Sequence, residues 1–228
     1  MEFNPSALQA KREQLLQSGV LMMDPGSVYV EEGVEVGVGT VLLPGTILRG
    51  KTVIGTDCQI GPQVMLTNCI VGKGCTINAS QCEDSELQDN CQIGPYTHIR
   101  PHCTVGEGSK IGAFVQLKNC TLGKGTKMAH LTYVGDSDVG DNCNFGCGTI
   151  TCNYDGFQKF RTTIGSDVFV GCNTNLVPPV QVGDGAFIAA ATTVTQDVPE
   201  DAMVIGRTRQ QVKEGWAAAN RAKKGKKA

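Results

Sequence analysis

Aliphatic side chains recur every six residues along much of this sequence. One series comprises Ile93, Ile99, Val105, Ile111 and Leu117, and a second comprises Ile164, Val170, Leu176, Val182, Ile188 and Val194. This period matches neither the 3.6 residues of an α-helical turn nor the two-residue repeat of an ordinary strand. Glycine repeatedly follows the aliphatic residue, which indicates a tight bend after each short strand. The chain is therefore expected to turn a corner once every six residues.

One short strand and one bend per hexad predict a parallel β-solenoid. Three hexads close a triangular coil, and the next coil stacks on it about 4.8 Å away. A single coil cannot bury its own interior, so stability is expected to come from the stacking of neighbours. The pattern extends from Val36 to about Val198, which is enough for roughly nine coils. Spacing alone does not set the handedness, although the usual crossover rule favours right-handed connections.

Composition fits one compact repeat domain and excludes several classes of function. The chain has 228 residues, 29 glycines and only 5% aromatic residues, which suits a narrow prism without room for large rings. Its formal net charge of -2 argues against nucleic-acid or membrane-surface partners. No run of eighteen apolar residues occurs, and the N-terminus lacks the features of a secretory signal. A cytoplasmic location is therefore expected.

The eleven cysteines have two interpretations. A disulfide framework or a metal site is disfavoured, because the number is odd and no Cys-x-x-Cys motif occurs. Five of them follow an inward aliphatic residue by four positions, the slot where a coil needs a small buried side chain: Cys58, Cys75, Cys91, Cys103 and Cys143. Free cysteine packs as a small hydrophobe. These thiols are therefore predicted to be reduced and structural.

Helices are expected at both ends of the solenoid. The first is predicted over Pro5–Gln17, with Asn4 as N-cap and Gly19 ending it. A second, over 210–222, carries Trp216 and is expected to cap the open end. The predicted organisation is a helix and turn over 1–27, a β-helix over 28–207, and a C-terminal helix with a solvated basic tail over 208–228.

The hexad pattern breaks once, between Thr151 and Thr163, and resumes at Ile164. Insertions in repeat proteins form loops on one face, often the binding face. This one concentrates an amide, a phenol, a lysine and an arginine. It is interpreted as part of a site, and a tolerated surface insertion is the alternative.

His130 lies shortly before this loop and is one of three histidines. A lone histidine near a turn is usually structural, because it can cap backbone groups. Arg100 and Lys118 lie about one to two coils upstream, so stacking could bring their cations onto the face of His130, near Tyr133 and Asn144. The expected presence of these polar side chains near His130 favours a functional role for this histidine.

Longer strings of the sequence resemble a known family. They are His130-Leu131-Thr132-Tyr133, the run 148–156 with Thr-Cys-Asn-Tyr-Asp-Gly, the run 167–171, and 213–216. Together they resemble the acetyltransferase half of the bifunctional bacterial N-acetylglucosamine-1-phosphate uridyltransferase/glucosamine-1-phosphate acetyltransferase. The resemblance runs from about Leu15 to Trp216, and the family's uridyltransferase half has no counterpart. A stand-alone acetyltransferase or a fragment cut at the linker is therefore expected.

The resemblance implies an all-β fold: a left-handed parallel β-helix, that is, a hexapeptide-repeat solenoid, with short N- and C-terminal helices. It also implies acetyl transfer from acetyl-CoA to the 2-amino group of glucosamine 1-phosphate, for UDP-N-acetylglucosamine and cell-wall synthesis. His130 matches the general base, a role that its pKa range suits. The sugar-phosphate positions are Arg100, Lys118, Tyr133, Asn144 and Lys159. The acetyl-CoA positions are Cys147, Asn153, Tyr154, Cys172, Ala190 and Arg207.

Two of these positions depart from the family, which commonly has alanine in place of Cys147 and serine in place of Cys172. A thiol forms only a weak hydrogen bond, so Cys172 bears on the affinity for acetyl-CoA. The resemblance further implies a homotrimer with sites between subunits, and no metal at the acetyltransferase site.

Three other functions were weighed. A γ-type carbonic anhydrase shares the solenoid and binds zinc on three histidines, and this chain has His98, His102 and His130. Their local sequence does not support that assignment. A non-catalytic trimerising module is disfavoured by the many matching polar residues. Acetylation of another amino sugar, or use of another acyl donor, remains an alternative.

Overall fold

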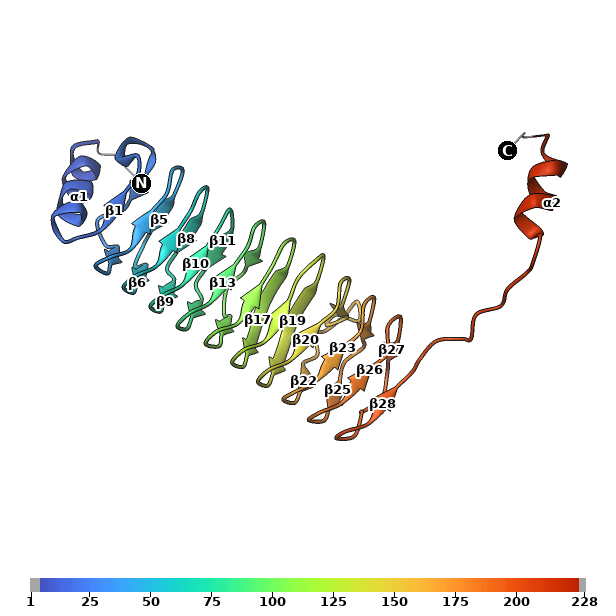
Figure 1. Cartoon of the computed structure of the whole chain (residues 1–228). Coiled ribbons are helices and arrows are strands. Elements are labelled where there is room, and N and C mark those ends of the chain that lie inside the picture. Colours follow the sequence, from blue (N-terminus) through green and yellow to red (C-terminus); the bar gives the residue numbers. More distant parts are fainter. Residues whose placement is uncertain (1–4, 226–228) are drawn as a thin grey trace.

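A computed structural model describes residues 5–225. Its core is a long triangular prism of stacked coils with helix α1 (Pro5–Gln17) at one end (Figure 1). The first helix is confirmed, whereas its predicted cap Asn4 lies outside the described residues. Val30, on the strand that α1 contacts, lies in the core with Leu15 of α1. The short 3-10 helix η1 (Pro25–Ser27) then leads into the coils.

Strands from successive coils pair in parallel along three faces of the prism. The first face comprises β1 (Leu21–Met22), β4 (Val41–Leu42), β7 (Gln59–Ile60), β10 (Thr76–Ile77), β13 (Gln92–Ile93), β16 (Lys110–Ile111), β18 (Lys127–Met128), β20 (Asn144–Phe145), β23 (Phe169–Val170), β26 (Phe187–Ile188) and β28 (Met203–Val204). Its strands follow one another in chain order from β1 to β28, as expected for a solenoid.

The other two faces are joined by two seven-residue strands, β17 (Gln116–Leu122) and β19 (Tyr133–Val139), which cross the corner between them. The second face also contains β2 (Tyr29–Val30), β5 (Ile47–Arg49), β8 (Met65–Thr67), β11 (Gln81–Glu83), β14 (His98–Ile99), β21 (Ile150–Thr151), β24 (Asn175–Leu176) and β27 (Thr193–Val194). The third contains β3 (Glu35–Val36), β6 (Val53–Ile54), β9 (Ile70–Val71), β12 (Glu86–Leu87), β15 (Thr104–Val105), β22 (Thr162–Ile164) and β25 (Val180–Val182).

The core consists of the predicted hexad positions. Ile99, Leu117 and Val134 are fully buried and stack in register on neighbouring coils of the second face. All eleven residues of the two aliphatic series are buried. Each coil thus contributes a layer of aliphatic side chains to one continuous core, as expected from the six-residue period.

Most of the glycines that follow the aliphatic residues serve a purpose different from the predicted one, although Gly61 and Gly94 do adopt a positive φ, of 110° and 98°. Gly55 has no positive φ, and a Cβ there would lie 2.7 Å from the backbone carbon of Gly72 on the next coil. Close stacking of coils therefore excludes a side chain. The left-handed backbone at the corners is instead adopted largely by other residues, such as Asp57 and Asn90. The sequence pattern locates the corners correctly, but the constraint on these glycines arises between coils.

The predicted cysteine slot is confirmed as buried, and it also has a polar role. Cys58 Sγ lies 3.1 Å from the carbonyl oxygen of Gly72, and Cys143 Sγ lies 3.0 Å from that of Gly165. Ser109 makes the same contact, from its hydroxyl to Gly123. The slot thus satisfies a carbonyl group at the corner of the next coil.

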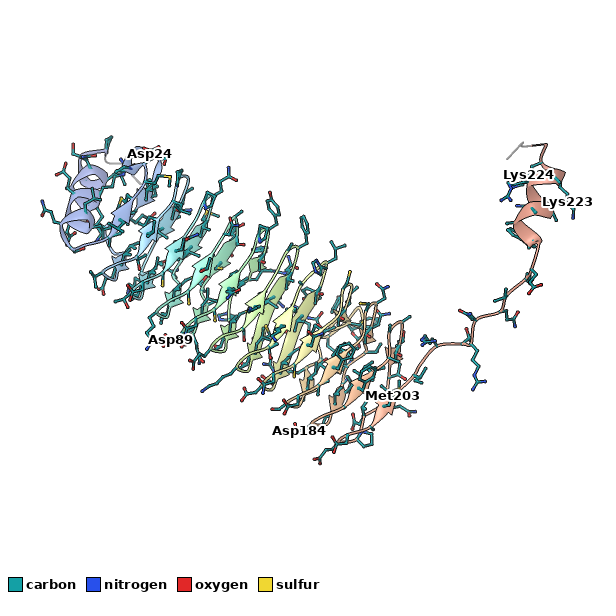
Figure 2. The ribbon with its side chains drawn as sticks, viewed as in Figure 1. Asp24, Asp89, Asp184, Met203, Lys223 and Lys224 are labelled. Carbon is teal, nitrogen blue, oxygen red and sulfur yellow. The ribbon has the colours of Figure 1, made fainter. Side chains whose placement is uncertain are left out.

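Two features at the edges complete the fold. Asp89 and Asp184 lie along one long edge of the prism (Figure 2), where their carboxylates accept the backbone N–H groups of Lys73 and Ser166. The C-terminal helix α2 (Trp216–Lys223) begins later than predicted, because Gly215 before it has a left-handed φ of 67°. It buries none of its residues and stands away from the solenoid (Figure 1), so the expectation that it caps the open end is wrong.

Candidate functional site

The segment that interrupts the repeat forms a small hairpin on the prism. Tyr154 and Lys159 are joined by an antiparallel bridge, and the Asp155 carboxylate accepts the backbone N–H groups of Phe157 and Gln158 at 2.8 Å each. These two bonds lower the pKa of the exposed Asp155 carboxyl. Phe157 at the tip is 94% exposed. The hairpin carries Asn153 and Lys159 at its base, next to the second face.

Arg161 anchors the C-terminal end of this hairpin to the neighbouring coils. Its guanidinium donates to both carboxylate oxygens of Asp138 on β19, and also to the carbonyl oxygens of Asn119 at 3.1 Å and Ser137 at 3.2 Å. The pair raises the pKa of Arg161 and lowers that of Asp138. A bidentate pair with two further bonds fixes direction as well as position. The chain therefore leaves the hairpin along one defined path.

Three cations meet where this hairpin approaches the second face. Arg100 lies one coil before Lys118, since its N–H donates to the Leu117 carbonyl group at 2.9 Å. The neighbouring Lys159 side chain lowers the pKa of Lys118, desolvation adds to this effect, and Arg100 adds a smaller repulsion. The predicted proximity of Arg100 and Lys118 is thus found, and Lys159 from the hairpin joins them. Cations held this close form a site for an anion such as a phosphate group.

A buried carboxylate lies among these cations. Asp136 Oδ2 is 3.7 Å from Lys118 Nζ and also accepts the side-chain amide of Asn153, while Oδ1 accepts that of Asn119 at 2.6 Å. Burial would raise the pKa of Asp136, but the two amides, Lys118 and Lys159 together lower it. The carboxyl is therefore ionised at neutral pH and partly balances the cations.

Tyr133 lies beside this network. Its ring is placed over Gly135, where a Cβ would come within 2.6 Å of the ring and 3.1 Å of the Asn153 amide nitrogen. Glycine is required at position 135 because any larger residue would displace Tyr133 or Asn153. The phenol and the Asn153 amide thus both lie over Gly135, and that amide donates to the Asp136 carboxylate.

His130 lies at the corner between the first and second faces, here called the first corner. It is exposed, its φ is 63°, its N–H donates to Ala113 at 2.9 Å, and its carbonyl oxygen accepts the Gly148 N–H at 3.1 Å. Both backbone groups are thus held by the coils on either side. The imidazole projects from a fixed backbone, three residues before Tyr133.

Four predicted acetyl-CoA residues lie beyond His130 along this first corner. The backbone N–H of Asn173, the residue after Cys172, donates to the Cys147 carbonyl group at 2.7 Å. The backbone N–H of Ala191, the residue after Ala190, donates to the Cys172 carbonyl group at 2.8 Å. Arg207 Nε then donates to the Ala190 carbonyl group at 2.9 Å. Cys147, Cys172, Ala190 and Arg207 therefore form a strip along one edge, one coil apart.

Asn144 is the predicted residue that lies on a different face. It belongs to β20 on the first face, paired with Lys127 and Phe169, whereas Tyr133 and Lys118 lie on the second face. The first corner separates the two groups within one chain.

Sequence reasoning missed Asp136 and Asn119, and it noted Arg161 only as the arginine of the interrupting segment. The signal was present, because Asn119, Asp136 and Asn153 are spaced seventeen residues apart, close to one coil. Such spacing stacks side chains at one corner, but it becomes informative only when the direction of each side chain is known.

The three histidines lie on different parts of the prism. His98 lies on β14 with its Nε2 4.0 Å from Glu83, His102 lies at the second corner, between the second and third faces, and His130 lies at the first. Across residues 5–225 no group of three His, Cys, Asp or Glu side chains is arranged to hold a metal ion. Within the same range, no helix is both long and apolar enough to cross a membrane.

The class of protein follows from these observations and from sequence comparison. The family model for the bacterial transferase hexapeptide (six repeats) matches residues 84–119 and 161–196. A solved structure of a Francisella novicida UDP-N-acetylglucosamine acyltransferase covers 91% of this chain and 74% of its own, with a TM-score of 0.50 and 16% identity. At that identity it bears on the fold alone. The fold is therefore a left-handed parallel β-helix with hexapeptide repeats.

Closer relatives make the resemblance specific. The chain is 50% identical to the bifunctional protein GlmU of Caldanaerobacter subterraneus subsp. tengcongensis, over 94% of this chain and 47% of that protein. It is 51% identical to GlmU of Caldicellulosiruptor saccharolyticus, over 88% and 43%. The predicted resemblance to this bifunctional family is confirmed. The chain spans about half the length of the curated relatives that it matches.

Proposed function

We propose that this chain transfers the acetyl group of acetyl-CoA to the 2-amino group of glucosamine 1-phosphate, for UDP-N-acetylglucosamine and cell-wall synthesis. In this proposal residues 28–207 carry the reaction. The proposal rests mainly on one observation: Arg100, Lys118 and Lys159 lie close together on the second face, which begins at the corner occupied by His130. The similarity to bifunctional GlmU supports the same reaction.

The cations suit a sugar phosphate better than a neutral sugar. Lys118 and Lys159 repel each other, and one buried carboxylate balances them only in part. A phosphate dianion would relieve this repulsion and accept several charge-assisted hydrogen bonds. Tyr133, next to the cations, would then contact the sugar ring. The phosphate thus fixes the end of the acceptor that does not react.

His130 is proposed as the general base. The amino group must lose a proton to attack the thioester, and imidazole is the usual acceptor at neutral pH. The side chain of His130 is exposed, and its backbone N–H and carbonyl groups are both hydrogen-bonded to neighbouring coils. Both features suit this role. Attack forms the carbon–nitrogen bond, and the carbon–sulfur bond then breaks to release CoA. The proton taken by His130 can pass to the departing thiolate.

The strip along the first corner is proposed to bind acetyl-CoA. Cys147, Cys172 and Ala190 recur once per coil, so an extended pantetheine arm could run beside them toward His130. Arg207, at the far end of the strip, suits an anionic part of the cofactor. Asn153 and Tyr154 are proposed to contact the arm from the hairpin.

A homotrimer is proposed because of the position of Asn144. Within one chain Asn144 is separated from Tyr133 by the first corner. Side-by-side solenoids could bring the first face of one subunit against the second face of its neighbour, and Asn144 would then reach a neighbouring acceptor. Sedimentation tests this assembly, since a monomer with full activity would refute a shared site.

The experiment that tests the reaction measures release of the CoA thiol on mixing the chain with acetyl-CoA and glucosamine 1-phosphate. Glucosamine serves as the acceptor control, and enzyme-only blanks correct for the protein's own thiols. Turnover should require the sugar phosphate. Absence of turnover by a folded trimer would favour another acceptor or a non-catalytic role.

A further inference from the structure

Asp136 is not among the residues that the family resemblance assigns to either substrate. It is 6% exposed, whereas Asp84, an aspartate at the same second corner, is exposed to solvent. We propose that Asp136 is a positioning residue, whose carboxylate holds the ammonium of Lys118 and the amide of Asn153 for binding of the sugar phosphate and acetyl-CoA. This inference rests on the proposed acetyl transfer.

The hydrogen bonds explain why a carboxylate is needed. Oδ1 accepts the Asn119 amide at 2.6 Å, while Oδ2 accepts the Asn153 amide and lies 3.7 Å from Lys118 Nζ. All three partners are donors, so the group between them must be an acceptor at both ends. An asparagine would offer one oxygen and turn an NH2 group toward another donor. At least one of the three contacts would then be lost, and two if the NH2 group took the place of Oδ2.

The charges around Lys118 also indicate that a carboxylate is needed at position 136. Lys118 faces two other cations, Lys159 and Arg100, and Asp136 is the acidic group that opposes their effect on it. Without that carboxylate, the Lys118 ammonium would move toward solvent or lose its proton more readily. Asp136 thus keeps one phosphate-binding cation charged and in place before the phosphate arrives.

Asp84 shows which contacts an aspartate makes at the second corner when it lies outside the site. Asp84 occupies the same corner three coils earlier, with φ of 40° against 48° for Asp136, and accepts the Asn68 amide at 3.0 Å. Unlike Asp136 it is exposed. Stacking of amide on carboxylate at the corner therefore needs no burial. The additional burial and contacts of Asp136 belong to the site.

Asp136→Asn tests the proposal, with Asp84→Asn as the matched control. Asparagine adopts the left-handed backbone as readily as aspartate does, so neither change should strain the corner. For Asp136→Asn the KM for glucosamine 1-phosphate should rise about tenfold and that for acetyl-CoA about threefold, with kcat within about threefold. The preference for glucosamine 1-phosphate over glucosamine should fall about tenfold. Asp84→Asn should match the wild type.

A direct readout does not depend on turnover. In NMR titrations of labelled lysine, the pKa of Lys118 should be lower in Asp136→Asn than in the wild type, since Asp136 raises it. A merely structural carboxylate would lower the melting temperature and leave this pKa, both KM values and the acceptor preference unchanged. That result would overturn the proposal.

Failure of the proposed function would look different, because the wild type itself would not turn over glucosamine 1-phosphate. If Asp136→Asn does not fold, Asn119→Gly removes the amide that holds the same carboxylate, leaves Lys118 in place and tolerates the left-handed φ of 47° at this position. It should raise the KM for glucosamine 1-phosphate at least threefold. An unchanged KM in that variant would overturn the proposal as well.

Discussion

Arg161 and Asp138 form a bidentate ion pair, with Nε to Oδ2 and Nη2 to Oδ1 both at 2.5 Å. Arg161 is the second residue after Lys159, and Asp138 is the second after Asp136. The pair therefore ties the end of the interrupting hairpin to the strand that carries the buried carboxylate. We therefore expect the position of Lys159 beside Lys118 to depend on this connection.

Arg161→Met should loosen the hairpin without opening the core. We expect the KM for glucosamine 1-phosphate to rise about threefold to tenfold, or about 0.7–1.4 kcal/mol, because Lys159 is no longer held. Steady-state kinetics would measure it. Arg49→Met is the control, since Arg49 pairs with Glu31 at 3.3 Å on coils far from the site. Equal effects of both substitutions would contradict the prediction.

The same pair predicts a dependence of stability on pH. Because Arg161 holds the pKa of Asp138 below its ordinary value, the stabilisation is complete above about pH 3.9 and is lost as pH falls through the lower folded-state pKa. The Arg161 and Asp138 side chains are 41% and 49% exposed, so the contribution should not exceed about 1 kcal/mol. Urea unfolding should show Asp138→Asn less stable than the wild type at pH 7, with a smaller difference near pH 2.5. A constant difference would contradict this.

The six-residue period predicted the fold because it is a local signal. Each inward residue, such as Ile99 or Leu117, is marked by its own hexad, and the stacking of hexads follows from strand geometry. The role of Gly55 was not predictable in the same way, since its constraint comes from Gly72 on the next coil. The late start of α2 has a local cause, the left-handed Gly215.

The candidate site was predicted in part. Lys118 and Arg100 meet because their spacing is close to one coil, so stacking alone brings them together. Asp136 was missed because its importance depends on burial and on three donors from separate coils, which no single stretch of sequence reveals.

His130→Asn should abolish most of the activity while preserving the fold. Asparagine tolerates the left-handed φ of 63° at this position, but it cannot act as a base near neutral pH. We expect kcat to fall by about 100-fold to 10,000-fold, with both KM values within about threefold. His102→Asn replaces a histidine with nearly the same φ, 66°, at the other corner. Its activity should equal that of the wild type, and a comparable loss there would show a structural cause.

The thiols should divide into two groups by reactivity. Eight of the eleven cysteines are buried, Cys147 and Cys152 are half-buried, and Cys172 is exposed. Burial raises the pKa of Cys69 to about 11, and a thiol reacts only as its thiolate. A disulfide reagent at pH 8 should therefore modify Cys172 quickly and the buried thiols only after unfolding. Rapid modification of more than three thiols in the native protein would contradict this burial pattern.

Cys172→Ser restores the residue common in the family. The Cys172 carbonyl group already accepts the Ala191 N–H at 2.8 Å, so the stacked coils hold the backbone whatever the side chain. If acetyl-CoA contacts that backbone, its KM should change by less than about threefold, or about 0.6 kcal/mol. Cys172→Ala is the companion variant, because it removes both the thiol and any hydroxyl. Product should be measured by chromatography, since each substitution alters the thiol blank. A much larger improvement with serine than with alanine would mean that the cofactor uses a hydroxyl at this corner, and that the chain's own cysteine weakens its hold on acetyl-CoA.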